Sequence, residues 1–215
     1  MLDLEVRDAD VDLSGTGKDQ AQALAAWLGS LEQDRRPTLA LSSPYRRAAE
    51  TARTALAAVE QEPEYDERLR ERDLGRFDGL TGAGIRARHA DEATRRQKVG
   101  KFYYQPPCGE SWADVVLRVR SLLTDLREGF DGERVWLFTH QAVIMCFRYV
   151  LEGLDEAQVL DLDRRIQIPN VSVSTFVREG DRFRCERFAA TEHLEQADAD
   201  VTRERSQGGR GDEQH

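Results

Sequence analysis

A chain of 215 residues, 40% of them hydrophobic, is long enough for one domain with a complete core. Its formal net charge of −9 at pH 7 excludes general binding to nucleic acid, although a local arginine cluster can still bind a small anion. Three widely spaced cysteines favour a reducing compartment over a disulfide framework. No stretch resembles a signal peptide or a membrane span, so we expect a cytoplasmic protein without a membrane partner.

The first predicted elements follow a polar lead-in over residues 1–12. Ser14 is placed to cap a helix whose apolar residues recur at helical spacing. The short apolar run over residues 38–41 predicts a buried strand. Ser43 and Pro44 then favour a second helix, because proline is tolerated in a first turn.

The middle of the chain alternates irregular and helical segments. Residues 62–79 have no regular pattern, and a polar helix is predicted to run from Thr81 into the region of Arg96. Ser111 begins a clear amphipathic helix with a capping-box pattern. The apolar run over residues 135–138 predicts a strand that is buried on both faces, as in parallel sheets.

The last third completes one folded unit, predicted over residues 13–193. The helix after His140 is apolar nearly all round and should lie in the interior. Residues 171–177 and 183–188 predict two strands joined by a turn. The charged, glycine-rich stretch over residues 194–215 predicts a disordered tail. Strands that alternate with helices favour an α/β fold with a mostly parallel sheet.

Three polar groups lie at the strand ends or helix starts where α/β proteins bind ligands. They are Arg47 in the first turns of a helix, Glu71 in a loop, and His140 directly after a buried strand. Together they suit phosphoryl transfer, which needs charge neutralisation and a proton donor. Each signal alone has a simpler structural explanation, because lone buried histidines and surface arginine pairs are common. Their order and spacing carry the interpretation.

In that order the motifs resemble those of the histidine phosphatase superfamily, also called phosphoglycerate mutase-like. The matching segments are Leu13-Ser14 through Gln20-Ala21, Ser42-Ser43-Pro44-Tyr45-Arg46-Arg47-Ala48 with Thr51-Ala52, Leu69-Arg70-Glu71 with Gly75, Phe77, Gly79 and Thr81, Gly109-Glu110-Ser111, and Phe138-Thr139-His140. Five motifs in register cover nearly the whole chain, from Leu13 to Phe188.

The resemblance implies a three-layer α/β/α sandwich and assigns a role to each candidate residue. Arg47 holds the phosphoryl oxygens, and His140 contacts the same group and stabilises its charge. Glu71 is the general acid for the leaving alkoxide. Gln141, where many members have glycine, adjoins the substrate. The resemblance implies no cofactor and no metal.

One family feature is absent from the sequence. The family's nucleophile is a histidine in an N-terminal Arg-His-Gly strand, which forms a phosphohistidine. The four histidines are His89, His140, His193 and His215, and none follows an apolar strand near the N-terminus. Either the sequence starts downstream of that strand, or the protein binds without turnover. We favour the first explanation, because the missing first strand lies inside the family's sheet and its loss would leave neighbouring strands unpaired.

The leading interpretation is therefore a phosphatase for a small phosphomonoester that works through a phosphohistidine in its complete form and is inactive as given. The alternatives are a non-catalytic phosphoester-binding or regulatory protein and a phosphoglycerate mutase-type phosphotransferase. His-Gln-Ala-Val with Gly-Glu-Ser is similar to the bisphosphatase domain of the bifunctional fructose-2,6-bisphosphate enzyme, but such short stretches do not fix the substrate. We expect the polar insert over residues 83–107, through Tyr103, Tyr104 and Gln105, to line the pocket. The substrate and the oligomeric state stay open.

Overall fold

The computed structural model describes residues 7–180 and 182–203 of the chain. Its helices are α1 (Gly15–Ser30), α2 (Arg46–Ala57), α3 (Gly82–Arg88), α4 (Ala90–Val99), α5 (Trp112–Gly129), α6 (Gln141–Glu152), α7 (Glu156–Arg165) and α8 (Glu192–Gln196), with short 3-10 turns η1 (Asp8–Asp10), η2 (Gln33–Arg35), η3 (Glu67–Leu69) and η4 (Gly75–Phe77). Its strands are β1 (Leu39–Ser42), β2 (Glu64–Tyr65), β3 (Val135–Phe138), β4 (Val173–Glu179) and β5 (Arg182–Ala190).

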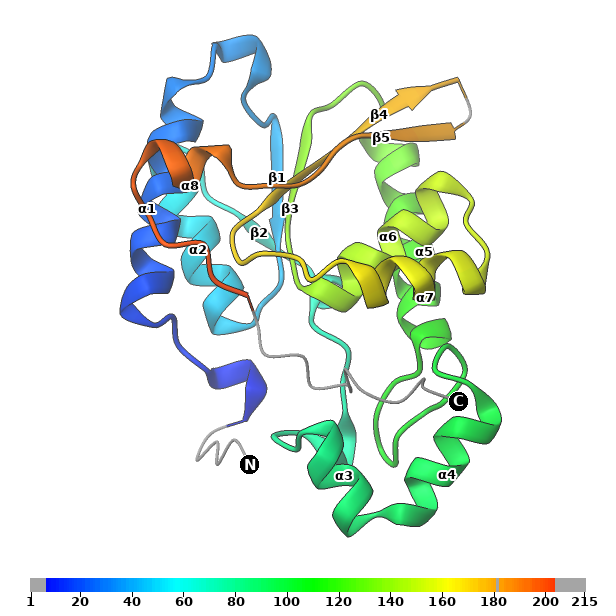
Figure 1. Cartoon of the computed structure of the whole chain (residues 1–215). Helices are drawn as coiled ribbons and strands as arrows, with labels where there is room; N and C mark the ends of the chain where they lie inside the picture. The colour runs from blue at the N-terminus through cyan, green and yellow to red at the C-terminus, as the bar shows by residue number, and fades with distance from the viewer. Residues whose placement is uncertain (1–6, 181, 204–215) are drawn as a thin grey trace.

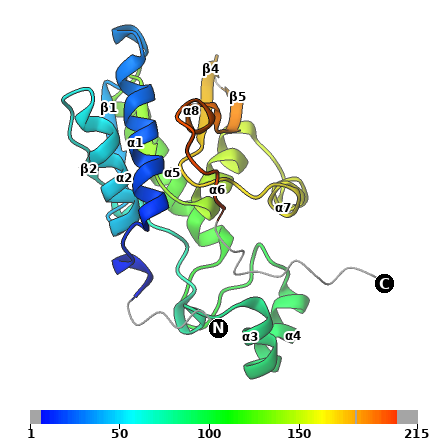
Figure 2. The same cartoon turned by 60° about the vertical axis from the view of Figure 1, so that its left-hand side comes forward.

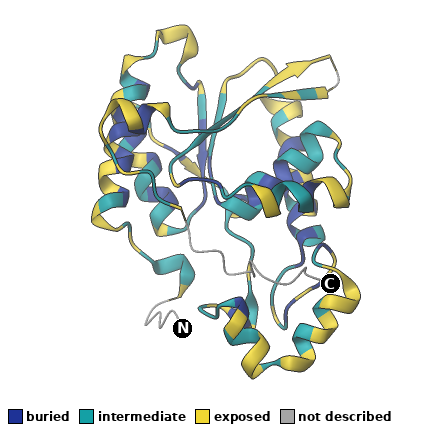
Figure 3. Cartoon of the chain, in the orientation of Figure 1, coloured by how far each residue is buried: buried dark blue, intermediate teal, exposed yellow. Residues whose placement is uncertain are grey.

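A parallel sheet with the strand order β2-β1-β3 forms the middle layer. Helices α1 and α2 lie on one side of this sheet, and α5 and α6 lie on the other (Figures 1 and 2). Neighbouring residues of β1 point to opposite faces, so Ala40 packs with α1 and α2 while Leu41 packs with α5 and α6. Figure 3 shows the buried residues concentrated on the inner faces of these helices. The predicted three-layer α/β/α fold is confirmed.

The hairpin of β4 and β5 forms a second, antiparallel sheet. Among the strands that the structure describes, β3 pairs only with β1, and β4 pairs only with β5. The sequence predicted burial of β3 on both faces, but only Phe138 at its end is buried and the other three residues are half-buried. An edge strand has less cover than a central one, which accounts for the difference.

The polar helix predicted from Thr81 is in fact two helices. Thr81 caps α3 through its side chain, as the sequence indicates. The backbone then breaks at His89, with φ −139° and ψ 57°, before α4 begins. His89 is half-buried, and its ring packs 5.1 Å from that of Phe77. The two helices, α3 and α4, lie together at one end of the molecule, below the sheet layers in Figure 1.

The folded part of the chain continues past residue 193, where the sequence predicted a tail. Leu194 in α8 is fully buried. Gln20 Nε2 in α1 donates hydrogen bonds to the Asp200 carbonyl (2.6 Å) and to Thr202 Oγ1 (2.9 Å). The rest of the predicted tail, residues 204–215, lies outside the described residues. No helix within residues 7–180 and 182–203 is long and apolar enough to span a membrane.

Candidate active site

The site is built where β1 and β3 end side by side. These parallel strands are in register, with Ser42 opposite Phe138, so the residues that follow them meet at one edge of the sheet. His140 Nε2 lies 2.9 Å from Ser43 Oγ, and both side chains are buried. The Tyr45 ring packs edge-on against the imidazole, with 5.3 Å between ring centroids. The predicted position of His140 at a strand end is therefore observed.

The buried imidazole of His140 is neutral near pH 7. Burial, together with the positive charges of Arg47 and Arg118, holds the pKa of His140 well below its usual range. A neutral imidazole can donate one hydrogen bond to an oxyanion without itself carrying a charge. Its environment also shows that both arginines lie close enough to act electrostatically on it.

The free energy of unfolding is expected to fall as the pH drops below about 6.5. In the unfolded chain His140 takes up a proton near that pH, whereas in the folded protein it resists protonation. Its contribution to the free energy of unfolding is therefore fully present above a pH of about 6.5 and is lost as the pH falls toward the lower pKa of the folded state. The expected slope is about 1.4 kcal/mol per pH unit. Urea unfolding at pH 7.5, 6.5 and 5.5 measures it, and His140→Asn should reduce the slope. If the free energy of unfolding depends on pH as steeply in His140→Asn as in the parent protein, His140 is not the group responsible.

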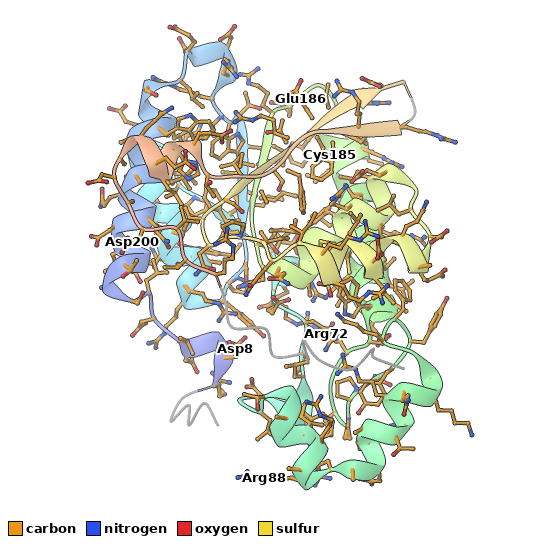
Figure 4. All side chains as sticks on the ribbon, in the orientation of Figure 1. Asp8, Arg72, Arg88, Cys185, Glu186 and Asp200 are labelled. Carbon is orange, nitrogen blue, oxygen red and sulfur yellow. The ribbon has the colours of Figure 1, made fainter. Side chains whose placement is uncertain are left out.

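Arg47 is engaged by a carboxylate through both ends of its guanidinium. Nη1 lies 3.0 Å from Asp8 Oδ1, and Nη2 lies 3.0 Å from Asp8 Oδ2. Nη1 also donates to the Asp8 carbonyl at 2.7 Å. Asp8 had been predicted to lie in a solvated lead-in, but it lies at the foot of the sheet layers, beside α2 (Figure 4). This bidentate contact shows that Arg47 can bind an oxyanion through two hydrogen bonds at once.

The loop that carries Glu71 is fixed by side chains from β3's end and from α5. Thr139 Oγ1 donates to the Leu69 carbonyl at 2.7 Å. Arg118 in α5 donates to the carbonyls of Arg68 (2.6 Å) and Glu71 (3.3 Å). The Glu71 carboxylate accepts a 2.7 Å hydrogen bond from the backbone N–H of the following residue. Glu71 is thus held on a rigid backbone, as a proton donor or acceptor requires.

Glu110, at the start of α5, connects the loop to the helix. Its carboxylate accepts hydrogen bonds from Arg70 (2.9 Å), from Arg118 (3.1 and 3.2 Å) and from the backbone N–H of Asp73 (3.0 Å). Arg70 therefore pairs with Glu110, across the loop. Arg118 was not among the site residues predicted from the sequence. A signal was present, because residue 118 falls on the apolar face of a helix defined by Val115 and Leu122.

The Glu71 loop also crosses the segment before α5 at very short range. Arg76 N donates to the Pro107 carbonyl at 3.0 Å, and Glu110 N donates to the Asp73 carbonyl at 2.8 Å. Gly75 has φ +55°, and a Cβ atom built on it would lie 2.2 Å from the Pro107 oxygen. Only glycine allows this approach. The crossing fixes the loop and the start of α5 as one unit.

Of the predicted site residues, Arg47 acts electrostatically on His140. Glu71 is connected to the same imidazole indirectly, because Arg118 acts on His140 and also donates to the Glu71 backbone carbonyl. Gln141 is the first residue of α6, directly after His140. The expected lining by residues 103–105 stays a prediction, because these side chains bond to other groups: Tyr103 to Glu156, Tyr104 to Glu92, and Gln105 to the Gly109 carbonyl. No group of three or more potential metal-binding side chains occurs within the described ranges.

The whole chain is similar in sequence and in fold to known proteins. A model of the histidine phosphatase superfamily (branch 1) matches residues 4–191, a range that includes all four predicted site residues. The chain is 34% identical over 170 residues to the 2,3-bisphosphoglycerate-dependent phosphoglycerate mutase of Methylobacterium radiotolerans. The match covers 77% of this chain and 78% of that protein. It is 33% identical over 142 residues to the Bifunctional protein Rv2228c of Mycobacterium tuberculosis.

That second match covers 65% of this chain but only 37% of the mycobacterial protein, so the chain spans little more than a third of that relative. Among solved structures, a mycobacterial glucosyl-3-phosphoglycerate phosphatase, Rv2419c, in complex with VO3 superposes with a TM-score of 0.72. Its sequence identity is 32%, and the superposition covers 85% of this chain and 88% of that one. The similarity therefore includes both sequence and fold.

Proposed function

The chain belongs to the histidine phosphatase superfamily, and on that premise we propose that its site binds the phosphoryl group of a small phosphomonoester for hydrolysis. The observation that carries the proposal is the contact of Arg47 with a carboxylate, made through both terminal nitrogens near a neutral, buried His140. Two groups that offer hydrogen bonds to one oxyanion in a water-poor site provide the charge stabilisation that phosphoryl transfer needs.

Each proposed role follows from the geometry of the site. Arg47 takes the phosphoryl oxygens in place of the Asp8 carboxylate, and His140 donates a ring N–H to the same group. Gln141 lies in the first turn of α6. The free backbone N–H groups of that turn favour a bound anion. Glu71, on its fixed loop, gives a proton to the leaving alkoxide. The relatives, a phosphoglycerate mutase and a sugar-phosphoglycerate phosphatase by name, support a small phosphomonoester as the ligand.

The nucleophile decides between two candidate functions. A phosphohistidine mechanism needs a second histidine facing phosphorus. Among the described residues, His89 packs against Phe77, and His193 Nε2 is 2.9 Å from the Val171 carbonyl, so neither faces the site. Within the part of the chain that the structure describes, this observation supports binding without turnover as the second candidate.

We expect the 215-residue chain to bind inorganic phosphate and orthovanadate, and Arg47→Ala to weaken both by about tenfold to a hundredfold. Hydrogen bonds to charged groups contribute about 1.5–3 kcal/mol, which corresponds to that range. Asp8→Asn should strengthen binding, because the competing carboxylate charge is gone. Isothermal titration calorimetry at fixed ionic strength measures the affinities.

Arg46→Ala is the matched control, since Arg46 is adjacent, has a 59% exposed side chain and pairs only weakly with Asp12. An equal loss of affinity in Arg46→Ala and Arg47→Ala would remove Arg47 from the site. The same preparations are assayed with an aryl phosphate, for which we expect little or no hydrolysis. Robust turnover that is lost in His140→Ala would show that the site is active without an N-terminal histidine and would contradict the account of the missing nucleophile.

A further inference from the structure

We propose that Ser43 is a positioning residue that decides which nitrogen of His140 meets the phosphoryl group: Ser43 donates to Nε2, and His140 presents its Nδ1–H to the ligand. The inference rests on the proposed function and deepens it by naming the atom that binds. Ser43 directly follows β1, and His140 lies two residues after the end of β3. Because these strands pair in parallel, with Ser42 opposite Phe138, the fold brings together two side chains that are 97 positions apart.

The hydroxyl group of Ser43 has a defined direction. Ser43 is fully buried, with 0% of the residue exposed. Its Oγ accepts a hydrogen bond from the Tyr45 backbone N–H at 3.2 Å and lies 2.9 Å from His140 Nε2. Within the part of the chain that the structure describes, Nε2 is the only acceptor that the hydroxyl proton meets. Because a buried donor without an acceptor is destabilising, the hydroxyl donates to Nε2 and does not accept from it.

His140 is therefore held in one tautomer. Its imidazole is neutral near pH 7, because burial and the charges of Arg47 and Arg118 hold its pKa well below the usual range. A neutral imidazole carries one proton, and the hydrogen bond made by one nitrogen decides whether the other bears it. Since Nε2 accepts from Ser43, the proton lies on Nδ1.

The protein itself leaves the Nδ1–H donor unused. His140 is only 8% exposed, and its Nδ1 atom has no hydrogen-bond partner among residues 7–180 and 182–203. In those ranges Gln20 Oε1 is the one fully enclosed side-chain nitrogen or oxygen without a partner, so Nδ1 reaches open space. Buried polar groups are nearly always hydrogen-bonded. A donor that opens to one side of a largely buried ring therefore suits an oxyanion from outside.

The ring of Tyr45 relates this donor to Arg47. It packs edge-on against the imidazole, with 5.3 Å between ring centroids, and its centre lies 5.4 Å from the guanidinium carbon of Arg47. The backbone N–H of Tyr45 also donates to Ser43 Oγ, so Tyr45 and Ser43 form one hydrogen-bonded turn. This turn contacts both groups that are proposed to bind the phosphoryl oxygens. It restricts rotation of the imidazole, as a positioned ligand group requires.

Nuclear magnetic resonance measures the tautomer directly in the ligand-free chain. The histidine nitrogens are isotopically labelled, and correlations from the carbon-bound ring protons to both ring nitrogens are recorded at pH 7.5. The spectrum of His140→Asn assigns the signals of His140. We expect a protonated Nδ1 and an unprotonated Nε2. Inorganic phosphate should then move the Nδ1–H proton downfield, because it forms a charge-assisted hydrogen bond with an oxyanion.

Ser43→Ala should release the tautomer, so that part of the His140 population carries its proton on Nε2. Phosphate affinity should fall by about tenfold, the lower end of the range for a hydrogen bond to a charged group. Ser42→Ala is the matched control, since Ser42 is equally buried but its Oγ donates to the Ser43 carbonyl at 3.0 Å. This control should keep the Nδ1 proton and the phosphate affinity of the parent. A purely structural role of Ser43 would lower the melting temperature without moving the proton.

The possible results are distinct. A proton on Nε2 in the ligand-free parent would overturn the proposal, because Ser43 would then accept. An unchanged tautomer in Ser43→Ala would overturn it as well. Phosphate that shifts only the Nε2 signal would place the ligand on the other nitrogen and contradict the inference, while the proposed function stands. If Nδ1 bears the proton but calorimetry detects no phosphate binding, the proposed function fails and only the tautomer set by Ser43 stands.

Discussion

Replacing Arg118 by methionine is expected to lower the free energy of unfolding by about 3–5 kcal/mol, the range for breaking a buried ion pair by removing one partner. The Arg118 side chain is only 9% exposed and that of Glu110 only 14%. Without Arg118, the Glu110 carboxylate loses two hydrogen bonds, and the carbonyls of Arg68 and Glu71 lose their donor. Methionine preserves the bulk of the side chain but satisfies none of these groups.

Urea unfolding followed by circular dichroism measures this difference. Arg120→Met, an exposed position two residues along the same helix, should change the free energy of unfolding by no more than about 0.5 kcal/mol. The double variant Arg118→Met with Glu110→Gln should be less destabilised than the sum of the single variants, since the Arg118–Glu110 interaction is lost in both single variants and is counted twice in their sum. A loss below about 1 kcal/mol in Arg118→Met would show that the network contributes little.

Gly75→Ala is expected to lower the free energy of unfolding by about 2–4 kcal/mol. Two effects add: about 1 kcal/mol or more for a left-handed backbone in an L-residue, and about 1–3 kcal/mol for overpacking. The new Cβ would lie 2.2 Å from the Pro107 oxygen and 2.6 Å from the backbone of Cys108, so the two crossing segments must separate. This movement also shifts the Glu71 loop, and phosphate affinity should fall with stability.

Gly29→Ala provides the control for Gly75→Ala. Gly29 lies inside α1, and its new Cβ would meet Ala58 Cβ at an ordinary 3.5 Å. Alanine favours the helix by up to about 1 kcal/mol, so this variant should be neutral or more stable. Thermal unfolding of both variants separates the effect of the crossing from that of adding a methyl group. Equal melting temperatures would show that the crossing relaxes at no cost.

The fold could be predicted because its signals are local. The capping box of Ser111 and Asp114 is formed as the sequence indicates, and it fixes where α5 begins. The runs that became β1 and β3 are short, apolar and separated by helical patterns, which favours parallel pairing. α7 was not predicted, although Asp155 and Gln158 form a second capping box with a readable spacing.

The contacts that make the site depend on distant pairs of residues, which local patterns do not contain. Nothing near Asp8 indicates that it pairs with Arg47, 39 positions later. Nor does anything near Arg70 indicate that it pairs with Glu110, 40 positions later. The roles of Arg47, Glu71, His140 and Gln141 stay predictions that the ligand titrations test. Their positions at strand ends and helix starts are what the sequence pattern indicated.

The one-sided pairing of β3 has a consequence for the behaviour of the protein in concentrated solution. Its residues, Val135–Phe138, carry no charge, and no proline interrupts them. Natural proteins guard such edges with charges, prolines or bulges, because an open apolar edge is a template for another extended chain. A segment that adds to β3 would complete its hydrogen bonds and cover its half-buried side chains. As far as the described strands show, one side of β3 is open, so self-association through this edge is the expected form of aggregation.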